Sequence, residues 1–140
     1  DSYFIEFPMV KQYMDKSIFK ARENEYVETI LGRRRYLKDI NSRNAMMRAF
    51  AERNAINAPI QGSAADIIKK AMIDIHREIE SRNLDSRMLL QVHDELVFDV
   101  KKTEKETLIA IVKEKMEQAI KLDVPLVIDM GVGKNWLEAH

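Results

Sequence analysis

The stretch Leu89-Leu90-Gln91-Val92-His93-Asp94-Glu95-Leu96-Val97-Phe98-Asp99-Val100 decides the fold, because two apolar runs flank three ionisable residues. Each run has the length and the content of β-branched and aromatic residues that are typical of a strand. The three ionisable residues therefore fall where the tight turn of a β-hairpin would lie. Two-residue turns need a positive φ, which His and Asp tolerate better than most residues. We predict a hairpin with a slightly strained turn, and strained turns gather at working sites.

Two adjacent carboxylates, Asp94 and Glu95, would lie at the tip of this hairpin. Hard divalent cations take oxygen ligands, so a rigid acidic tip has the chemistry to hold one. A solvated polar turn is the more common fate of such a pair. The pair alone leaves both interpretations open.

The composition is typical of one soluble globular domain: 140 residues, of which 46% are hydrophobic and 33% charged. The chain has no cysteine, which excludes disulfides and thiolate metal sites. No apolar run approaches the roughly 20 residues of a membrane-spanning helix, and no signal peptide opens the chain, so we expect a cytoplasmic location. The formal net charge is zero, but the segment 32–53 carries seven Lys and Arg against two acidic residues. Such a local excess attracts a phosphate backbone.

Several helices are expected from the periodicity and the end signals. Pro8 and a one-sided apolar pattern predict a helix over 8–23, with a short strand over 26–30 behind it. Asn41-Ser42 predicts the cap of a second helix over 43–57, which Pro59 should end or kink. Ser63-x-x-Asp66 has the form of a capping box, which predicts the start of a third helix.

The C-terminal part predicts one more helix and one more strand. Thr103-x-x-Glu106 resembles a capping box that opens a fourth helix, and 124–130 is typical of a strand with Pro125 near its start. The glycines in 131–136 lack the third glycine of a dinucleotide-binding loop, which we reject. The fold class is therefore α+β, with an antiparallel sheet of the hairpin and a C-terminal strand covered by helices.

Three consecutive arginines in Gly32-Arg33-Arg34-Arg35-Tyr36-Leu37 cannot share one core, so this segment is exposed. Two interpretations of this segment remain open: it is a solvated basic loop, or it contacts phosphates. The planar guanidinium of Arg suits a contact with phosphates.

Arg53 and Asn57 are four residues apart and lie on one helix face, and Gln61 follows. These side chains have the donors to reach acceptors in a minor groove, although ordinary surface residues give the same pattern.

Together these segments resemble family A DNA polymerases, the bacterial DNA polymerase I group. The segment 91–97 looks like the third palm motif of that family, and 52–62 resembles the segment that precedes it. The segments 32–37 and 133–136 also resemble family segments, in the same order, so the resemblance covers essentially the whole chain.

The resemblance implies a function and a division of the chain. It implies template-directed addition of deoxynucleotides to a primer 3′ end by two-metal nucleotidyl transfer. Residues 1–40 would be the end of the fingers subdomain and 41–140 the C-terminal part of the palm. Asp94 would ligate catalytic Mg²⁺, Glu95 would support it and His93 would lie near the primer terminus. The DNA contacts implied are Arg33, Arg34, Arg35, Arg53, Asn57 and Gln61.

Two family elements are not recognisable: the Asp-Tyr-Ser-type strand with another catalytic Asp, and the fingers helix that grips the incoming nucleotide. We expect the chain to begin downstream of both, so that it holds part of a Mg²⁺ site and does not polymerise DNA alone. The expected partners are primer-template DNA and deoxynucleoside triphosphates, with no membrane. We expect a monomeric, nucleoid-associated parent, whereas the piece alone could dimerise through an exposed face.

Two alternatives stay open. The first is a DNA-binding module without chemistry, which steeply salt-dependent binding would indicate. The second is a metal-dependent nuclease that uses Asp94 and Glu95. That chemistry needs further ligands, and Asp99 and His76 lie elsewhere in the predicted fold, so we favour it least.

Overall fold

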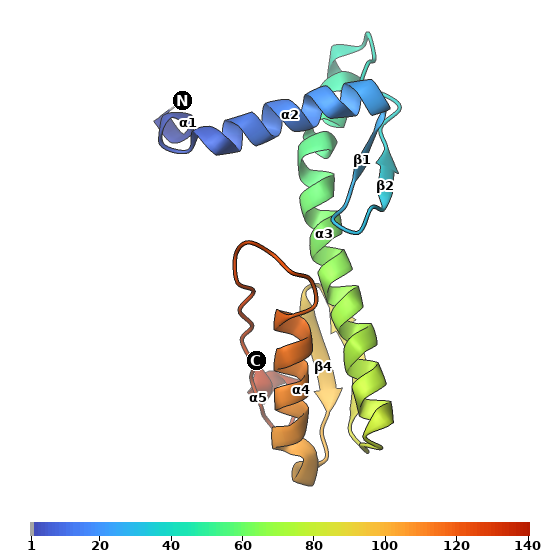
Figure 1. Ribbon diagram of the computed structural model, residues 1–140, viewed down its shortest axis with the longest axis vertical. Helices are drawn as coiled ribbons and strands as arrows, with labels where there is room; N and C mark the ends of the chain where they lie inside the picture. Colours follow the sequence, from blue (N-terminus) through green and yellow to red (C-terminus); the bar gives the residue numbers. More distant parts are fainter. Residues whose placement is uncertain (1) are drawn as a thin grey trace. The chain divides into compact units, whose positions relative to one another are not determined.

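A computed structural model describes residues 2–140 (Figure 1), which divide into two compact units, one ending at Asp66 and one from Ile67 to His140. Each unit contains helices and one two-stranded antiparallel sheet. The predicted α+β class is therefore confirmed. Among the described residues, no helix combines the length and the apolar content that a bilayer crossing requires.

The first unit begins with two helices and a small hairpin. Its elements are α1 (Ser2–Glu6), α2 (Pro8–Asn24), β1 (Tyr26–Glu28), β2 (Arg34–Tyr36) and the N-terminal part of α3 (Ala45–Ser81). The predicted helix over 8–23 is confirmed. It ends because Glu25 adopts a left-handed φ of 61° and donates its N–H to the Ala21 carbonyl at 2.7 Å.

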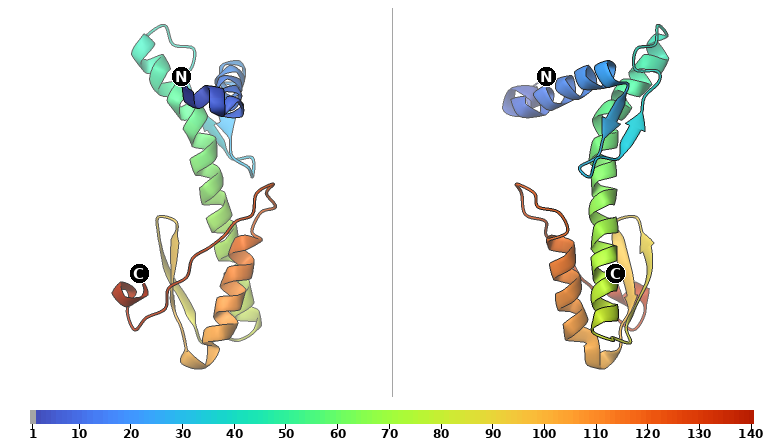
Figure 2. Two further views of the ribbon diagram at one scale, coloured as in Figure 1. Left: turned by 90° about the vertical axis from the view of Figure 1, so that its left-hand side faces the viewer. Right: turned by 45° about the vertical axis from the view of Figure 1, so that its right-hand side comes forward.

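A small apolar core holds this unit together. Ala21 of α2 packs with Leu37 and Ile40, which follow β2, and with two alanines of α3. β1 pairs with β2 so that Tyr26 faces Tyr36, a pairing the sequence did not predict. Figure 2 shows this hairpin beside α3 in both of its views. β1 is shorter than the predicted strand over 26–30.

The prediction of separate helices over 43–57 and from Ser63 is wrong, because α3 runs unbroken from Ala45 to Ser81 with Pro59 inside it. An interior proline costs about 3 kcal/mol through its missing N–H and a clash with the preceding turn. Burial of small and apolar side chains on either side of Pro59, such as Ala55 and Ala71, offsets that cost.

The predicted cap at Asn41-Ser42 is also wrong. The side chain of Asn44 caps α3, because its Oδ1 accepts from the N–H groups of Met46 at 3.0 Å and Met47 at 3.3 Å. Asn41 instead donates to the Arg22 carbonyl. Any of these polar residues suits a cap, so the sequence alone did not choose among them.

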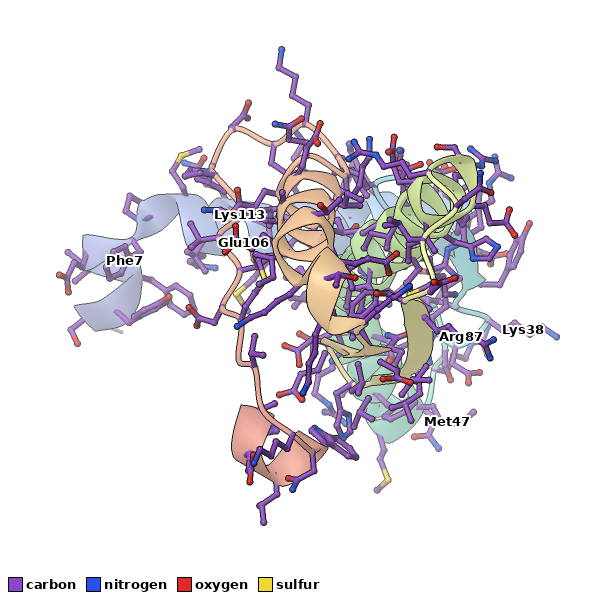
Figure 3. All side chains as sticks on the ribbon, turned by 90° about the horizontal axis from the view of Figure 1, so that it is seen from below. Phe7, Lys38, Met47, Arg87, Glu106 and Lys113 are labelled. Carbon is purple, nitrogen blue, oxygen red and sulfur yellow. The ribbon has the colours of Figure 1, made fainter. Side chains whose placement is uncertain are left out.

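The second unit contains the predicted hairpin, formed by β3 (Arg87–Val92) and β4 (Glu95–Asp99). η1 (Lys102–Glu104), α4 (Lys105–Glu117) and α5 (Trp136–Ala139) follow it. In Figures 1 and 2 the hairpin, α4 and the C-terminal part of α3 lie side by side. Their shared core includes Ile75 and Ile79 of α3 and Leu108 and Val112 of α4, with Leu96 and Phe98 of β4 against it. Figure 3 labels exposed side chains of this unit, among them Arg87, Glu106 and Lys113.

Two predictions for the C-terminal part are wrong. Thr103 does not cap α4, because the helix begins at Lys105 after the turn of η1. The segment 124–130 forms no strand among the described residues, although Ile128 packs on the core. A strand needs a neighbour that pairs with its N–H and C=O groups, and Pro125 has no N–H to offer.

Candidate functional site

The acidic turn, residues 93–95, joins β3 to β4 in the second unit. His93 has a φ of 54°, which confirms the predicted positive φ. A positive φ at the first central residue is the pattern of a type II′ turn, where glycine is usual. The side chain of Gln91 donates to the His93 carbonyl at 2.8 Å and holds the turn. All three residues of the turn are exposed, so their side chains are available to a ligand.

The two carboxylates of the acidic turn differ in their surroundings. Glu95 Oε1 lies 3.0 Å from Nε2 of His140, at the C-terminal end of the chain, whereas Asp94 has no polar partner among the described residues. Gly131 and Gly133 allow the backbone before α5 to approach Ala139 and Glu138, because a Cβ at either glycine would overlap those residues. Asp94 is thus the freer carboxylate.

The acidic turn has the chemistry of part of a magnesium site. Asp94 and Glu95 offer carboxylate oxygens, which are the ligands that Mg²⁺ prefers. Within residues 2–140, no third carboxylate or imidazole joins them in a group able to hold a metal ion. Asp99 lies at the far end of β4, opposite Arg87, and His76 contacts Glu80 on α3. Asp94 and Glu95 are therefore the carboxylates that this turn offers to a cation.

In the first unit, Arg53, Asn57 and Gln61 lie along one helix, because α3 does not break at Pro59. All three side chains are exposed. Successive residues four apart follow one side of a helix. The guanidinium of Arg53 lies 5.7 Å from the ring centre of Phe50, so this row has an aromatic neighbour.

The three arginines belong to the hairpin β1–β2, which we call the arginine hairpin (26–36): Arg33 directly precedes β2, and Arg34 and Arg35 are its first two residues. With Gln61 and Gly62 of α3 they line a shallow pocket of about 190 Å³. Arg34 donates to Glu28 at 3.1 Å, and its guanidinium lies 4.2 Å from the ring centre of Tyr26. Hydrogen bonds with Tyr36 and Glu28 raise the pKa of Arg34. Arg35 has no ion pair among the described residues.

A buried carboxylate fixes the arginine hairpin on α3. Asp66 is only 2% exposed and accepts from Nε of Arg33 at 2.5 Å and from the N–H of Leu31 at 3.3 Å. Burial, the largest influence, raises the pKa of Asp66. Hydrogen bonds from Thr29, Arg33 and Leu31, with the charge of Arg33, outweigh it and hold the pKa below the ordinary 3.8. Asp66 is therefore ionised at neutral pH.

The predicted capping box Ser63-x-x-Asp66 is wrong, and its two polar residues hold the arginine hairpin instead. Ser63 Oγ accepts from the N–H of Ile30 at 2.9 Å, beside the contacts of Asp66. Serine and aspartate suit both a helix start and an acceptor for a neighbouring loop. The spacing alone did not distinguish the two, so sequence reasoning missed Asp66 as a site residue.

A sequence profile described as DNA polymerase family A matches residues 1–138. The chain belongs to DNA polymerase family A. Its relatives include proteins named DNA polymerase I from Geobacillus stearothermophilus, at 55% identity, and from Bacillus subtilis (strain 168), at 51%. Both alignments extend over 139 residues, which is 99% of this chain.

Structural comparison gives the same family. The fold matches the POL domain of Pol1 from M. smegmatis, solved in complex with DNA primer-template and dNTP, with a TM-score of 0.96 and 50% identity. The match covers 98% of this chain and 24% of that domain chain. The chain spans 16% of the length of the family A relatives named above.

Proposed function

We propose that the chain is the C-terminal part of a DNA-directed DNA polymerase, which we call the parent polymerase. The observation that carries this proposal is an exposed carboxylate pair on a hairpin turn, in a chain of DNA polymerase family A. The parent polymerase adds deoxynucleotides to a primer 3′ end as a template directs. Residues 1–40 would belong to its fingers and 41–140 to its palm, and it would act in the cytoplasm at the nucleoid, in replication and repair.

The acidic turn has the central role in this chemistry. Asp94 holds Mg²⁺ and Glu95 supports it, while His93 lies near the primer terminus. When bound, a pair of Mg²⁺ ions would activate the primer hydroxyl and stabilise the leaving pyrophosphate. Phosphoryl transfer asks the protein mainly for positioning and charge stabilisation. The short turn supports that role, because Gln91 and the strand pairing on both sides hold the backbone that carries the two carboxylates.

The exposed row on α3 and the arginine hairpin bind the primer-template. Arg53, Asn57 and Gln61 would contact base edges in the minor groove, where the acceptors of A·T and T·A pairs are alike. They would therefore sense the shape of a pair more than its sequence. Arg33, Arg34 and Arg35 would contact phosphates, for which the guanidinium fork is well suited.

A substitution of Asp94 tests the proposal in the parent polymerase. Asp94→Ala should abolish primer extension and leave the affinity for primer-template nearly unchanged, because the turn itself carries little of the DNA contact. Asp99→Ala is the matched control, since it removes an exposed carboxylate from the end of β4 that lies away from the acidic turn. Extension that survives in Asp94→Ala would remove this residue from the catalytic role.

The 140 residues alone should bind Mg²⁺ weakly and should not extend a primer, because Asp94 and Glu95 supply only part of a metal site. A primer-extension assay on the 140-residue chain tests this. Template-directed synthesis by this chain would contradict the prediction.

A second candidate function is DNA binding without chemistry by the 140 residues. The pocket of the arginine hairpin favours it, because it gathers guanidinium groups beside the amide of Gln61. Binding to primer-template that weakens steeply between about 50 and 200 mM salt would support this function.

A further inference from the structure

Asp66 is a buried carboxylate beside arginines that we propose bind DNA, and a negative charge is unexpected at such a position. A negative charge near arginines lowers the positive potential that attracts phosphates. Its burial is also unfavourable unless hydrogen bonds compensate. Two residues of the arginine hairpin, Leu31 and Arg33, donate hydrogen bonds to Asp66. The carboxylate is thus fully engaged with the turn between β1 and β2.

The contacts of Arg33 fix the direction of its guanidinium. Nε donates to Asp66 Oδ1 at 2.5 Å, and Nη2 donates to the Gly62 carbonyl at 3.3 Å. These bonds occupy one edge of the fork, and Nη1 has no partner among the described residues. The side chain remains 52% exposed and lines the pocket with Arg35 and Gln61. One edge is anchored and the other is presented to the pocket.

Gly62 allows this close approach. A Cβ at this position would lie 2.5 Å from Cγ2 of Thr29, a separation that real Cβ atoms do not show. The backbone of α3 and the turn of the arginine hairpin therefore meet without an intervening side chain. The carbonyl of Gly62 becomes reachable for Arg33 for the same reason.

We propose that Asp66 is a positioning residue for DNA binding: it anchors one edge of Arg33 so that the other edge is presented to a phosphate of the primer-template. This inference rests on the proposed function. An anchored fork loses less side-chain freedom when it binds, which raises affinity. In this proposal, the affinity for DNA that is gained by ordering Arg33 exceeds the affinity that is lost because Asp66 lowers the positive potential.

Steady-state primer extension by the parent polymerase tests this, with Asp66→Asn, Arg33→Lys and the double variant. Each single variant should raise KM for primer-template about five- to tenfold and leave kcat within about twofold, because the lost contact is made equally before and during the reaction. The double variant should show no larger effect than either single one, since Asp66 acts through Arg33. Asp74→Asn is the charge-matched control, because the one ion pair of Asp74 among the described residues is with Lys70 on α3.

The possible outcomes separate this inference from the proposed function. If Asp66 acted only through its charge, Asp66→Asn would lower KM for primer-template, because it removes a negative charge near the arginines. An unchanged or lower KM in Asp66→Asn, or effects that add in the double variant, would overturn the inference alone. If Asp66→Asn fails to fold, Arg33→Lys decides, because its side chain is half exposed and its charge is kept. A wild-type parent that neither binds nor extends primer-template overturns the proposed function and this inference with it.

Discussion

Arg34 and Arg35 are neighbours in the chain, but their surroundings differ. Both line the pocket with Gln61, but Arg34 is held by Glu28 and Tyr26, whereas Arg35 has no ion pair among residues 2–140. We therefore expect Arg35→Gln to reduce the salt dependence of DNA binding by the parent polymerase by about one unit in the log–log slope. Arg34→Gln is the matched control and should change that slope less. Equal changes would contradict this difference between the two arginines.

His93 has a left-handed φ that glycine adopts more easily. A non-glycine residue in this region costs roughly 1–2 kcal/mol, and glycine in turn gives the unfolded chain more freedom. We expect His93→Gly to leave the free energy of unfolding unchanged or to raise it by up to about 1 kcal/mol. The same variant should slow primer extension by the parent polymerase, because it removes the imidazole that we propose lies near the primer terminus. Urea unfolding and extension assays measure the two effects, and a clear loss of stability would contradict the first.

At the scale of elements, the substitution of Pro59 is the one from which we expect the largest change in stability. It lies inside α3 and removes one backbone donor, while the hydroxyl of Tyr13 donates to the Ile56 carbonyl at 3.3 Å in the same region. Pro59→Ala should restore a helical hydrogen bond and stabilise the 140-residue chain by about 2–3 kcal/mol. Thermal unfolding followed by helical circular dichroism measures this. Ala64→Ser, an exposed position on the same helix, is a control for composition. A lower unfolding temperature in Pro59→Ala would show that a bend at this position is needed for packing.

The sequence predicted the elements whose signals are local. The hairpin over 89–100 and the helix from Pro8 follow from alternation, turn tolerance and a proline at a helix start, and these are confirmed. The predicted end of the helix near Pro59 was wrong, because tertiary packing outweighed the local preference of proline against a helix interior. Strand 124–130 was wrong because pairing depends on a neighbour, which no local pattern contains.

The site could be predicted in part for the same reason. Adjacent carboxylates in a turn are visible in the sequence, and the resemblance to family A polymerases, not the pair alone, suggested the metal role of Asp94 and Glu95. The role of Asp66 depends on residues 29–33 lying against 62–66, a contact between segments about 33 residues apart. Its sequence neighbours suggested a helix cap instead. Contacts between segments so far apart in the chain cannot be predicted from a single sequence.

At the scale of the whole molecule, three carboxylates link stability to pH. The pKa of Asp66 lies below 3.8, as described above. A hydrogen bond from the backbone N–H of Asp85, followed by one from the hydroxyl of Ser86, lowers the pKa of Glu104 below 4.5, and the bond from Lys101 lowers the pKa of Asp85 below 3.8. A lowered folded-state pKa contributes stability that is complete above the ordinary value and is lost as the pH falls through the folded value. The chain should therefore be stable at neutral pH and lose stability progressively below about pH 4.5.

The chain offers a separate optical probe for each unit. All four tyrosines (Tyr3, Tyr13, Tyr26 and Tyr36) lie in the first unit, and the single tryptophan, Trp136, lies in the second. In Asp66→Asn, the stability followed by tyrosine fluorescence should depend less on pH in the acid range. In Glu104→Gln, the stability followed by Trp136 fluorescence should depend less on pH in the same range. In both variants stability at neutral pH falls, because the lost bonds were complete there. Asp123→Asn, an exposed carboxylate without an ion pair among the described residues, should change neither. An acid dependence that persists unchanged in both test variants would mean that these carboxylates do not set the acid limit of the fold.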